Sequence, residues 1–225
     1  MSKFGLNYRY PAGYAVEVGE QSSYNHRFGG SSWKVIDPQP LEDGPALLLV
    51  LDLTDPRLSA MAAKHRYELP VCSYINSDLW VEEQVYRFDE ESKTVWLVHK
   101  TSNECYTLPE EDRFPTPLPE TRIALRELQP AELPLDEDSY WRNTDDFLGG
   151  SVVFRVMGSP LWLDAPEEVK CSCGRHMTHI VGIGYENWNG PFHFLDQIPF
   201  FLGEAALYAF ACPVCPELRV ISQPT

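Results

Sequence analysis

Residues 207–221, with the sequence LYAFACPVCPELRVI, decide how the second half of this chain folds. Two runs rich in β-branched and aromatic residues, 207–210 and 218–221, flank a short turn that contains two prolines. Such runs are typical of β-strands, and proline-containing links are typical of the turns between them. We therefore expect a β-hairpin whose turn carries Cys212 and Cys215.

A second cysteine pair, Cys171 and Cys173, precedes the apolar run MTHIVGIGY at residues 177–185. Each pair offers two thiols from one tight turn, and zinc with four sulfur ligands takes two ligands from each of two loops. We predict a structural zinc site made of Cys171, Cys173, Cys212 and Cys215. Because four protein ligands leave no position for water, such a site would serve folding rather than chemistry.

Other interpretations of these cysteines remain open. They could be reduced thiols without a metal, or disulfides, although Cys171 and Cys173 are too close in sequence for an unstrained mutual bond. C-x-C is a less common zinc spacing than C-x2-C, so His176 could replace one cysteine. We expect nearby cations, Lys170, Arg175 and Arg219, to offset the charge of the thiolates. The isolated cysteines, Cys72 and Cys105, are expected to be buried small hydrophobes.

Farther out, the same order of features occurs twice. The first series has FGGSSW at 28–33, ALLLVLDL at 46–53 and a hairpin pattern over 85–98. The second has VMGSPLW at 156–162, the strand at 177–185 and the hairpin at 207–221. ALLLVLDL is apolar on both faces, so we expect a buried central strand. We predict two pseudo-repeated halves, each containing a sheet.

The segment between the halves differs in character. Six prolines fall between Pro109 and Pro134 among acidic residues, and proline disfavours regular structure. Only residues 120–128 (ETRIALREL) have helical character there, and residues 58–67 are expected to form another short helix. We predict an α+β fold, mainly β. Its parts are an N-terminal half at 1–104, a proline-rich acidic connection at 105–147 and a C-terminal half at 148–225 that holds the zinc.

The composition, 44% apolar and 23% charged, is that of a globular protein, and the net charge is −15. The first residues contain no apolar stretch suited to a signal peptide, and no run is long enough to span a bilayer. We expect a cytoplasmic protein without membrane attachment. An acidic surface repels phosphate backbones and attracts basic proteins, so we expect a basic protein partner and no nucleic acid.

Motifs typical of enzymes, such as a Walker A loop, HExxH or GxSxG, are absent from the sequence. Aromatic residues on loops often anchor partner contacts, which makes Trp162, Tyr185, Trp188 and Phe192 candidates for partner binding. The alternative is that this aromatic segment folds onto its own core.

The string MGSPLWLDAPEEVKCSCGRHMTHIVGIGY at 157–185, with the later CPVC pair, resembles the YwqG-like family. That family joins bacterial proteins of unknown function with relatives of eukaryotic programmed cell death protein two. The resemblance covers 156–221 and is weaker over 28–98. Three features depart from the family pattern: Met157 in place of glycine, Gly182 in place of glutamine, and the C-x-C pair. The resemblance implies a duplicated β-rich fold, and the eukaryotic relatives are chaperones of a basic ribosomal protein.

Three functional hypotheses follow. The first is a zinc-stabilised protein-binding module, a chaperone or adaptor for a basic client. The second is an immunity or antitoxin-type protein that neutralises a basic toxin, which the same charge would suit. The third is an enzyme that uses an unrecognised pocket.

Overall fold

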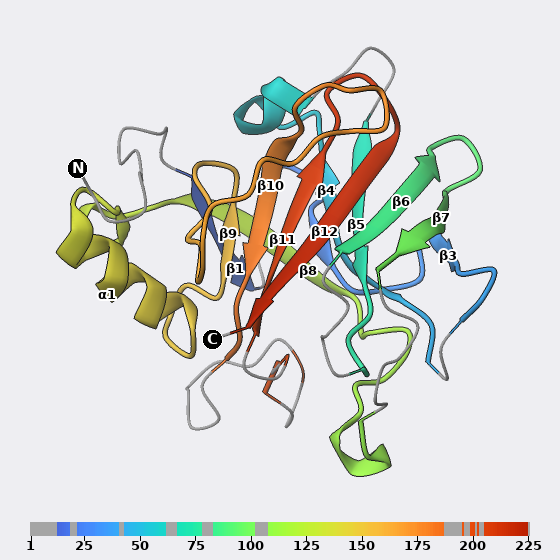
Figure 1. Ribbon diagram of the computed structural model, residues 1–225, viewed down its shortest axis with the longest axis horizontal. Helices are drawn as coiled ribbons and strands as arrows, with labels where there is room; N and C mark the ends of the chain where they lie inside the picture. The colour runs from blue at the N-terminus through green and yellow to red at the C-terminus, as the bar shows by residue number, and fades with distance from the viewer. Residues whose placement is uncertain are drawn as a thin grey trace.

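The computed structural model describes residues 13–18, 22–40, 43–61, 67–77, 83–101, 108–186, 195, 199–200, 202 and 205–224. Within these residues, twelve strands form one sheet (Figure 1). The strands are β1 (Tyr14–Val18), β2 (Arg27–Phe28), β3 (Lys34–Ile36), β4 (Ala46–Asp52), β5 (Glu68–Ser73), β6 (Glu83–Asp89), β7 (Thr94–Lys100), β8 (Thr121–Glu127), β9 (Phe154–Val156), β10 (Thr178–Ile183), β11 (Ala205–Ala211) and β12 (Glu217–Pro224). The helical elements are the α-helix α1 (Glu137–Phe147) and the 3₁₀ turns Pro56–Met61, Glu110–Asp112 and Pro130–Glu132.

The sheet order is β3-β7-β6-β12-β11-β10-β9-β1-β8-β2-β4-β5. All pairs are antiparallel except β3 with β7. The last strand in the order, β5, also lies close to β6 and β12. There the Tyr74 N–H donates to Gln84 Oε1 at 3.2 Å, so the sheet curls back on itself and encloses the core. The expectation of a mainly β fold is confirmed.

Both predicted hairpins are present. β6 and β7 pair up to Asp89 opposite Thr94, and β11 and β12 pair up to Ala211 opposite Leu218. The run ALLLVLDL forms β4, in which every residue but the last is buried, and which is paired on both sides. Its apolar side chains on both faces are the reason for this buried position.

Strands from the two ends of the chain share the sheet. β12 pairs with β6, and β9 pairs with β1 (Figure 1). The segments predicted as separate halves therefore contribute to one hydrogen-bonded sheet rather than to two sheets.

The expectation of a helix over residues 120–128 is wrong, because this segment forms β8 between β1 and β2. Ile123 and Leu125 are buried while the residues beside them are more exposed. This alternation has the period of two that suits a strand, and tertiary pairing overrides the helix propensity of Ala, Leu, Arg and Glu.

The predicted connection also contains α1, which the sequence interpretation missed. Asp136 caps the helix, because its side chain accepts a hydrogen bond from the Ser139 N–H at 2.8 Å. Tyr140 and Phe147 face inward and belong to a second apolar cluster with residues of β11. The short helix expected at 58–67 begins as the 3₁₀ turn Pro56–Met61, and residues 62–66 lie outside the described part of the chain.

In each of the two series of sequence features, the first strand pairs with the second, and the register is the same in both: β2 with β4 in one series and β9 with β10 in the other. The opposed residues are Phe28 with Leu49 and Arg27 with Val50 in one case, and Val156 with Val181 and Arg155 with Gly182 in the other. The next residues, Gly29 and Met157, both have positive φ, and their N–H groups donate to Leu48 and Ile180 carbonyls. Beyond β4 and β10, the structure differs from our expectation. The strand that pairs with β10 is β11, the first strand of the hairpin at 207–221, whereas the strand that pairs with β4 is β5. We expected the hairpin at 85–98, rather than β5, to correspond to residues 207–221.

Within the described residues, no helix combines the length and the hydrophobicity that crossing a membrane requires.

Candidate metal centre

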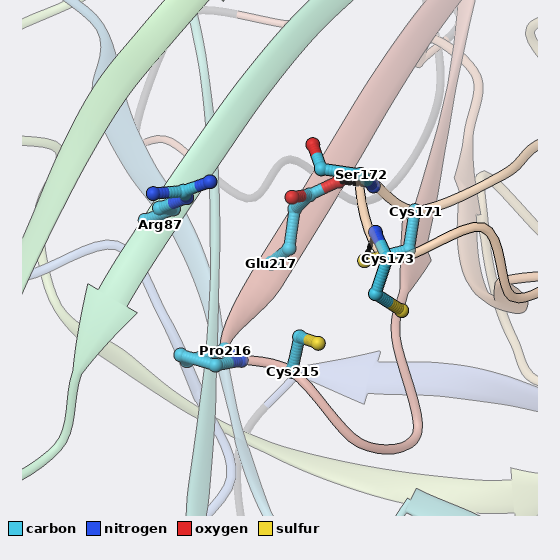
Figure 2. Close-up of a pocket in the computed structure, with 7 residues that line it drawn as sticks. All are labelled: Arg87, Cys171, Ser172, Cys173, Cys215, Pro216 and Glu217. Carbon is cyan, nitrogen blue, oxygen red and sulfur yellow. Dashed lines mark hydrogen bonds between the residues drawn. The ribbon is translucent and has the colours of Figure 1, made fainter.

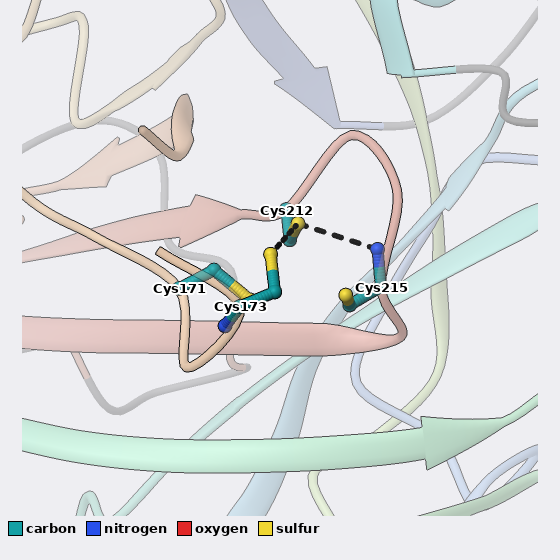
Figure 3. A group of neighbouring side chains, drawn as sticks. All are labelled: Cys171, Cys173, Cys212 and Cys215. Atoms are coloured by element: carbon teal, nitrogen blue, oxygen red, sulfur yellow. Dashed lines mark hydrogen bonds between the residues drawn. The ribbon is translucent and has the colours of Figure 1, made fainter. Parts of the chain in front are cut away.

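The two cysteine pairs lie at one end of neighbouring strands. Cys171 and Cys173 lie in the link that leads into β10, and Cys212 and Cys215 lie in the turn that leaves β11. Because β10 and β11 are antiparallel neighbours, the start of one and the end of the other lie side by side. Figure 3 shows the four side chains converging from these two turns.

Hydrogen bonds close the first turn. The Gly174 N–H donates to the Cys171 carbonyl at 2.8 Å, and the Cys171 N–H donates to the Arg175 carbonyl at 2.9 Å. Gly174 has a φ of 83°, a left-handed conformation that glycine adopts without steric cost. The chain can therefore double back within a few residues and direct both thiols to the same side.

The second turn is organised around the sulfur of Cys212. The Cys215 and Val214 N–H groups donate to Cys212 Sγ at 3.2 and 3.5 Å. The Cys212 N–H donates to the Glu217 carbonyl at 3.0 Å, which closes the hairpin. In the first turn, the Cys173 N–H similarly points to Cys171 Sγ at 3.5 Å. Amide donors of this kind stabilise the thiolate form of a cysteine.

All four sulfur atoms lie within 4.8 Å of one another, and Cys173 Sγ is 3.9 Å from Cys212 Sγ. The four cysteines are free of disulfides. A tetrahedral zinc–sulfur centre with bonds of about 2.3 Å would place its sulfurs about 3.8 Å apart. No sulfur–sulfur distance would have to shorten by more than about 1 Å to reach that geometry. The predicted cysteines therefore form a group that could hold a metal ion.

The two turns bury their cysteines unequally. Cys171 and Cys212 are 4% and 0% exposed, whereas Cys215 is partly buried and Cys173 is exposed. Burial raises the pKa of Cys171, while a hydrogen bond from the Arg175 backbone lowers the pKa of Cys173 to about 7. A bound metal ion would deprotonate all four thiols.

Glu217 connects the turns. Its buried carboxylate accepts a hydrogen bond from the Ser172 N–H at 2.8 Å, between the first two cysteines. Burial alone would raise the pKa of Glu217, but the Ser172 hydrogen bond and the Arg219 charge outweigh it, so the pKa is lowered. Arg219 lies 3.4 Å from this carboxylate and 2.7 Å from Glu83.

A shallow pocket of about 390 Å³ opens beside the cluster (Figure 2). Its lining combines cysteines of both turns with Glu217 and with Arg87, which lies directly opposite Glu217 across the β6–β12 pair. Arg87 was missing from the cations expected to offset the thiolates. Only the pairing of β6 with β12 brings it to this site, and no local sequence pattern indicates that pairing. Lys170, one of the cations expected to offset the thiolates, forms an ion pair with Glu168, with 3.0 Å between Nζ and Oε2.

His176, the alternative ligand, lies outside the sulfur cluster. Its side chain is 70% exposed, and its Nδ1 is 3.3 Å from Glu168 Oε1. The four sulfurs alone make up the group, so the structure favours the cysteine-only ligand set. Cys72, expected to be a buried hydrophobe, is fully buried, and this burial raises its pKa. Cys105 lies outside the described residues.

The four aromatic candidates for partner binding do not form a described surface. Trp162 is 6% exposed, with its ring stacked on Phe210 at 5.8 Å and tilted against Tyr208 at 4.7 Å. Trp162 is thus part of the core, as the alternative interpretation, an aromatic segment folded onto its own core, predicts for this residue. Tyr185 is partly buried, and Trp188 and Phe192 lie outside the described residues.

No protein-family model, curated protein or solved structure matches this chain. The resemblance to the YwqG-like family therefore stays a prediction.

Proposed function

We propose that the four cysteines bind one zinc ion and that the chain is a zinc-stabilised binding protein. The observation that supports zinc is the set of four sulfurs within 4.8 Å, two from each of two tight turns. Tetrahedral sulfur sites take zinc or iron, and a site closed by four protein ligands is structural. The zinc would fasten the link before β10 to the turn after β11.

Metal analysis tests this assignment. Protein purified without added metal should contain one zinc per chain, and cobalt substitution should give the visible absorption of a tetrahedral thiolate site. Cys212→Ser should abolish stoichiometric zinc, while Cys72→Ser, at a buried cysteine outside the cluster, should keep it. Iron in place of zinc would contradict the choice of metal, and full zinc retention in Cys212→Ser would contradict the site.

We propose that the binding partner is a basic protein. Support comes from the net charge of −15 and from exposed acidic runs at the turn Glu110–Asp112 and at the start of α1. Charges of this kind steer basic partners and speed their encounter. A chaperone or adaptor for a basic client is the activity that this surface would suit.

Capture experiments at two salt concentrations test the partner proposal. A partner retained at low salt should have a basic sequence, and its affinity should fall about tenfold or more as salt screens the charges. Replacing Glu110, Glu111 and Asp112 by their amides should weaken binding, and so should amides at Glu137 and Asp138, which leave the Asp136 cap in place. An affinity that does not change with salt concentration would overturn the proposal that charge attraction holds the partner.

We also propose that the chain consists of two related halves, as the resemblance to the YwqG-like family implies. The supporting observation is the shared register of β2 with β4 and of β9 with β10. Outward from the β1–β8 contact, the strand order is β8-β2-β4-β5 on one side and β1-β9-β10-β11 on the other. The strands that correspond would then be β5 with β11 and β6 with β12.

A further inference from the structure

The most exposed ligand of the cluster is Cys173. Residues 172–176 are all exposed, whereas Cys171 and Cys212 are buried at the base of the two turns. The pocket of Figure 2 opens on Cys173 and on Cys215, so a small reagent can reach the sulfur atoms from solvent. This asymmetry distinguishes the centre from one in which all four sulfurs are enclosed.

Reactivity follows from this geometry. A thiolate is the nucleophilic form of cysteine, and coordination to a metal keeps the sulfur in that form. A second sulfur, Cys212 Sγ, lies 3.9 Å from Cys173 Sγ, which is close enough for a disulfide after a modest closure of the turn. An exposed thiolate with a neighbouring resolving cysteine is the arrangement of a redox-sensitive site.

We infer that Cys173 is a site of oxidation by hydroperoxides, and that its oxidation releases the metal through a disulfide with Cys212. This inference rests on the proposed zinc site. The partner is hydrogen peroxide or an organic hydroperoxide.

The chemistry balances in two steps. First, the Cys173 thiolate attacks the distal peroxide oxygen, the O–O bond breaks, and the sulfur becomes a sulfenic acid while hydroxide or an alkoxide leaves. The sulfur is oxidised by two electrons, and the peroxide is reduced by two. Second, the Cys212 thiolate attacks the Cys173 sulfur, the S–S bond forms and the S–O bond breaks, releasing hydroxide. Protons from water neutralise the leaving groups.

The metal then loses two of its four ligands. The remaining pair, Cys171 and Cys215, comes from opposite turns and does not form a closed tetrahedral set. Oxidation at one exposed sulfur would thus replace the metal link between the two turns by a covalent Cys173–Cys212 bond.

The test uses full-length protein carrying Cys105→Ser, so that a cysteine outside the described residues does not react. Zinc content is measured first, because protein without zinc would contradict the proposed function rather than this inference. Zinc-loaded protein is then treated with hydrogen peroxide, and released zinc is followed with a chromogenic chelator. Disulfides are mapped by peptide mass spectrometry at early times. We expect zinc release to parallel the appearance of a Cys173–Cys212 disulfide, and a dithiol with added zinc to restore the site.

Two variants sharpen the result. Cys173→His keeps four zinc ligands but removes the exposed thiolate, so peroxide-driven release should slow by about tenfold or more. Cys72→Ala removes a buried thiol and should release zinc at the wild-type rate. If Cys173→His fails to bind zinc, the disulfide map of the Cys105→Ser protein, in which Cys173 is intact, decides. A first disulfide other than Cys173–Cys212, or zinc that stays bound while Cys173 is oxidised, would overturn the inference.

Discussion

Glu217 is the residue that links the two cysteine turns most directly. Its carboxylate accepts the Ser172 N–H while its own backbone carbonyl accepts the Cys212 N–H. Outer residues of this kind orient metal ligands, and their loss typically lowers metal affinity by about 10- to 100-fold.

We predict that Glu217→Ala lowers zinc affinity by about this factor, and that Glu217→Gln, which keeps an acceptor oxygen, lowers it less. Competition with a chelator of known affinity measures the change. Equal zinc affinity in the alanine variant and the wild-type protein would show that the Ser172 hydrogen bond does not position the ligands.

His179 carries a second prediction at this scale. Burial lowers the pKa of His179 to about 4 from an ordinary value of 6.5. Its Nδ1 lies 3.2 Å from the Gly158 carbonyl, which can only accept, so Nδ1 carries the proton of the neutral ring. Between these pKa values the unfolded chain binds a proton that the folded chain excludes.

Stability from His179 is therefore present above pH 6.5 and is lost as the pH falls toward 4. The full loss is about 3 kcal/mol. As the pH falls over that range, we predict that the unfolding free energy of the wild-type protein decreases by about this amount relative to that of His179→Phe. Denaturant titration in excess zinc measures the difference. Parallel pH curves for the two proteins would contradict the buried neutral histidine.

At the scale of elements, the contact between β10 and the end of α1 depends on Gly184. A methyl group there would lie 2.0 Å from the Phe147 carbonyl oxygen, whereas one at Gly44 would meet nothing within 4 Å. The Gly-Ile-Gly sequence at 182–184 thus allows the end of a helix to pack closely against a strand.

We predict that Gly184→Ala destabilises the protein by about 1–3 kcal/mol, because the backbone of α1 has to shift. Gly44→Ala should change the unfolding free energy by less than about 0.5 kcal/mol. Chemical denaturation of both variants makes the comparison. A neutral Gly184→Ala would mean that α1 does not dock on β10 as described.

Elements with strong local signals could be predicted from the sequence. The hairpin at 207–221 has aromatic and β-branched runs around a proline-containing turn, β4 is a continuous apolar run, and the cysteine spacing indicates a metal site. β8 was mistaken for a helix because its residues favour helices and only its neighbours β1 and β2 select a strand. Helix α1 had a usable signal in the Asp136 cap and in the spacing of Tyr140, Thr144 and Phe147.

Other features depend on contacts that no local pattern encodes. Arg87 reaches the cluster only because β6 pairs with β12, which is far away in the chain. Trp162 is buried because α1 and β11 enclose it, so an aromatic residue on a loop became core.

For the whole molecule, the shared sheet has a consequence for unfolding. β12 pairs with β6 and β9 pairs with β1, so neither end of the chain has a sheet of its own. Loss of a cysteine ligand is therefore not expected to unfold the C-terminal half alone. Interleaved strands should unfold together.

We predict one cooperative thermal transition in the wild-type protein. Cys212→Ser should lower the temperature of that single transition. Two resolved transitions in differential scanning calorimetry would indicate independent halves and would contradict the coupling through β6 and β12.

The most direct measurement is the zinc content of the folded chain, determined by mass spectrometry under native conditions together with elemental analysis. Two tight turns placing four sulfurs within 4.8 Å predict a mass increase of one zinc, which chelation removes and which Cys171→Ser and Cys212→Ser lack. Folded protein with reduced cysteines and no bound metal would contradict the zinc site at the centre of this structure.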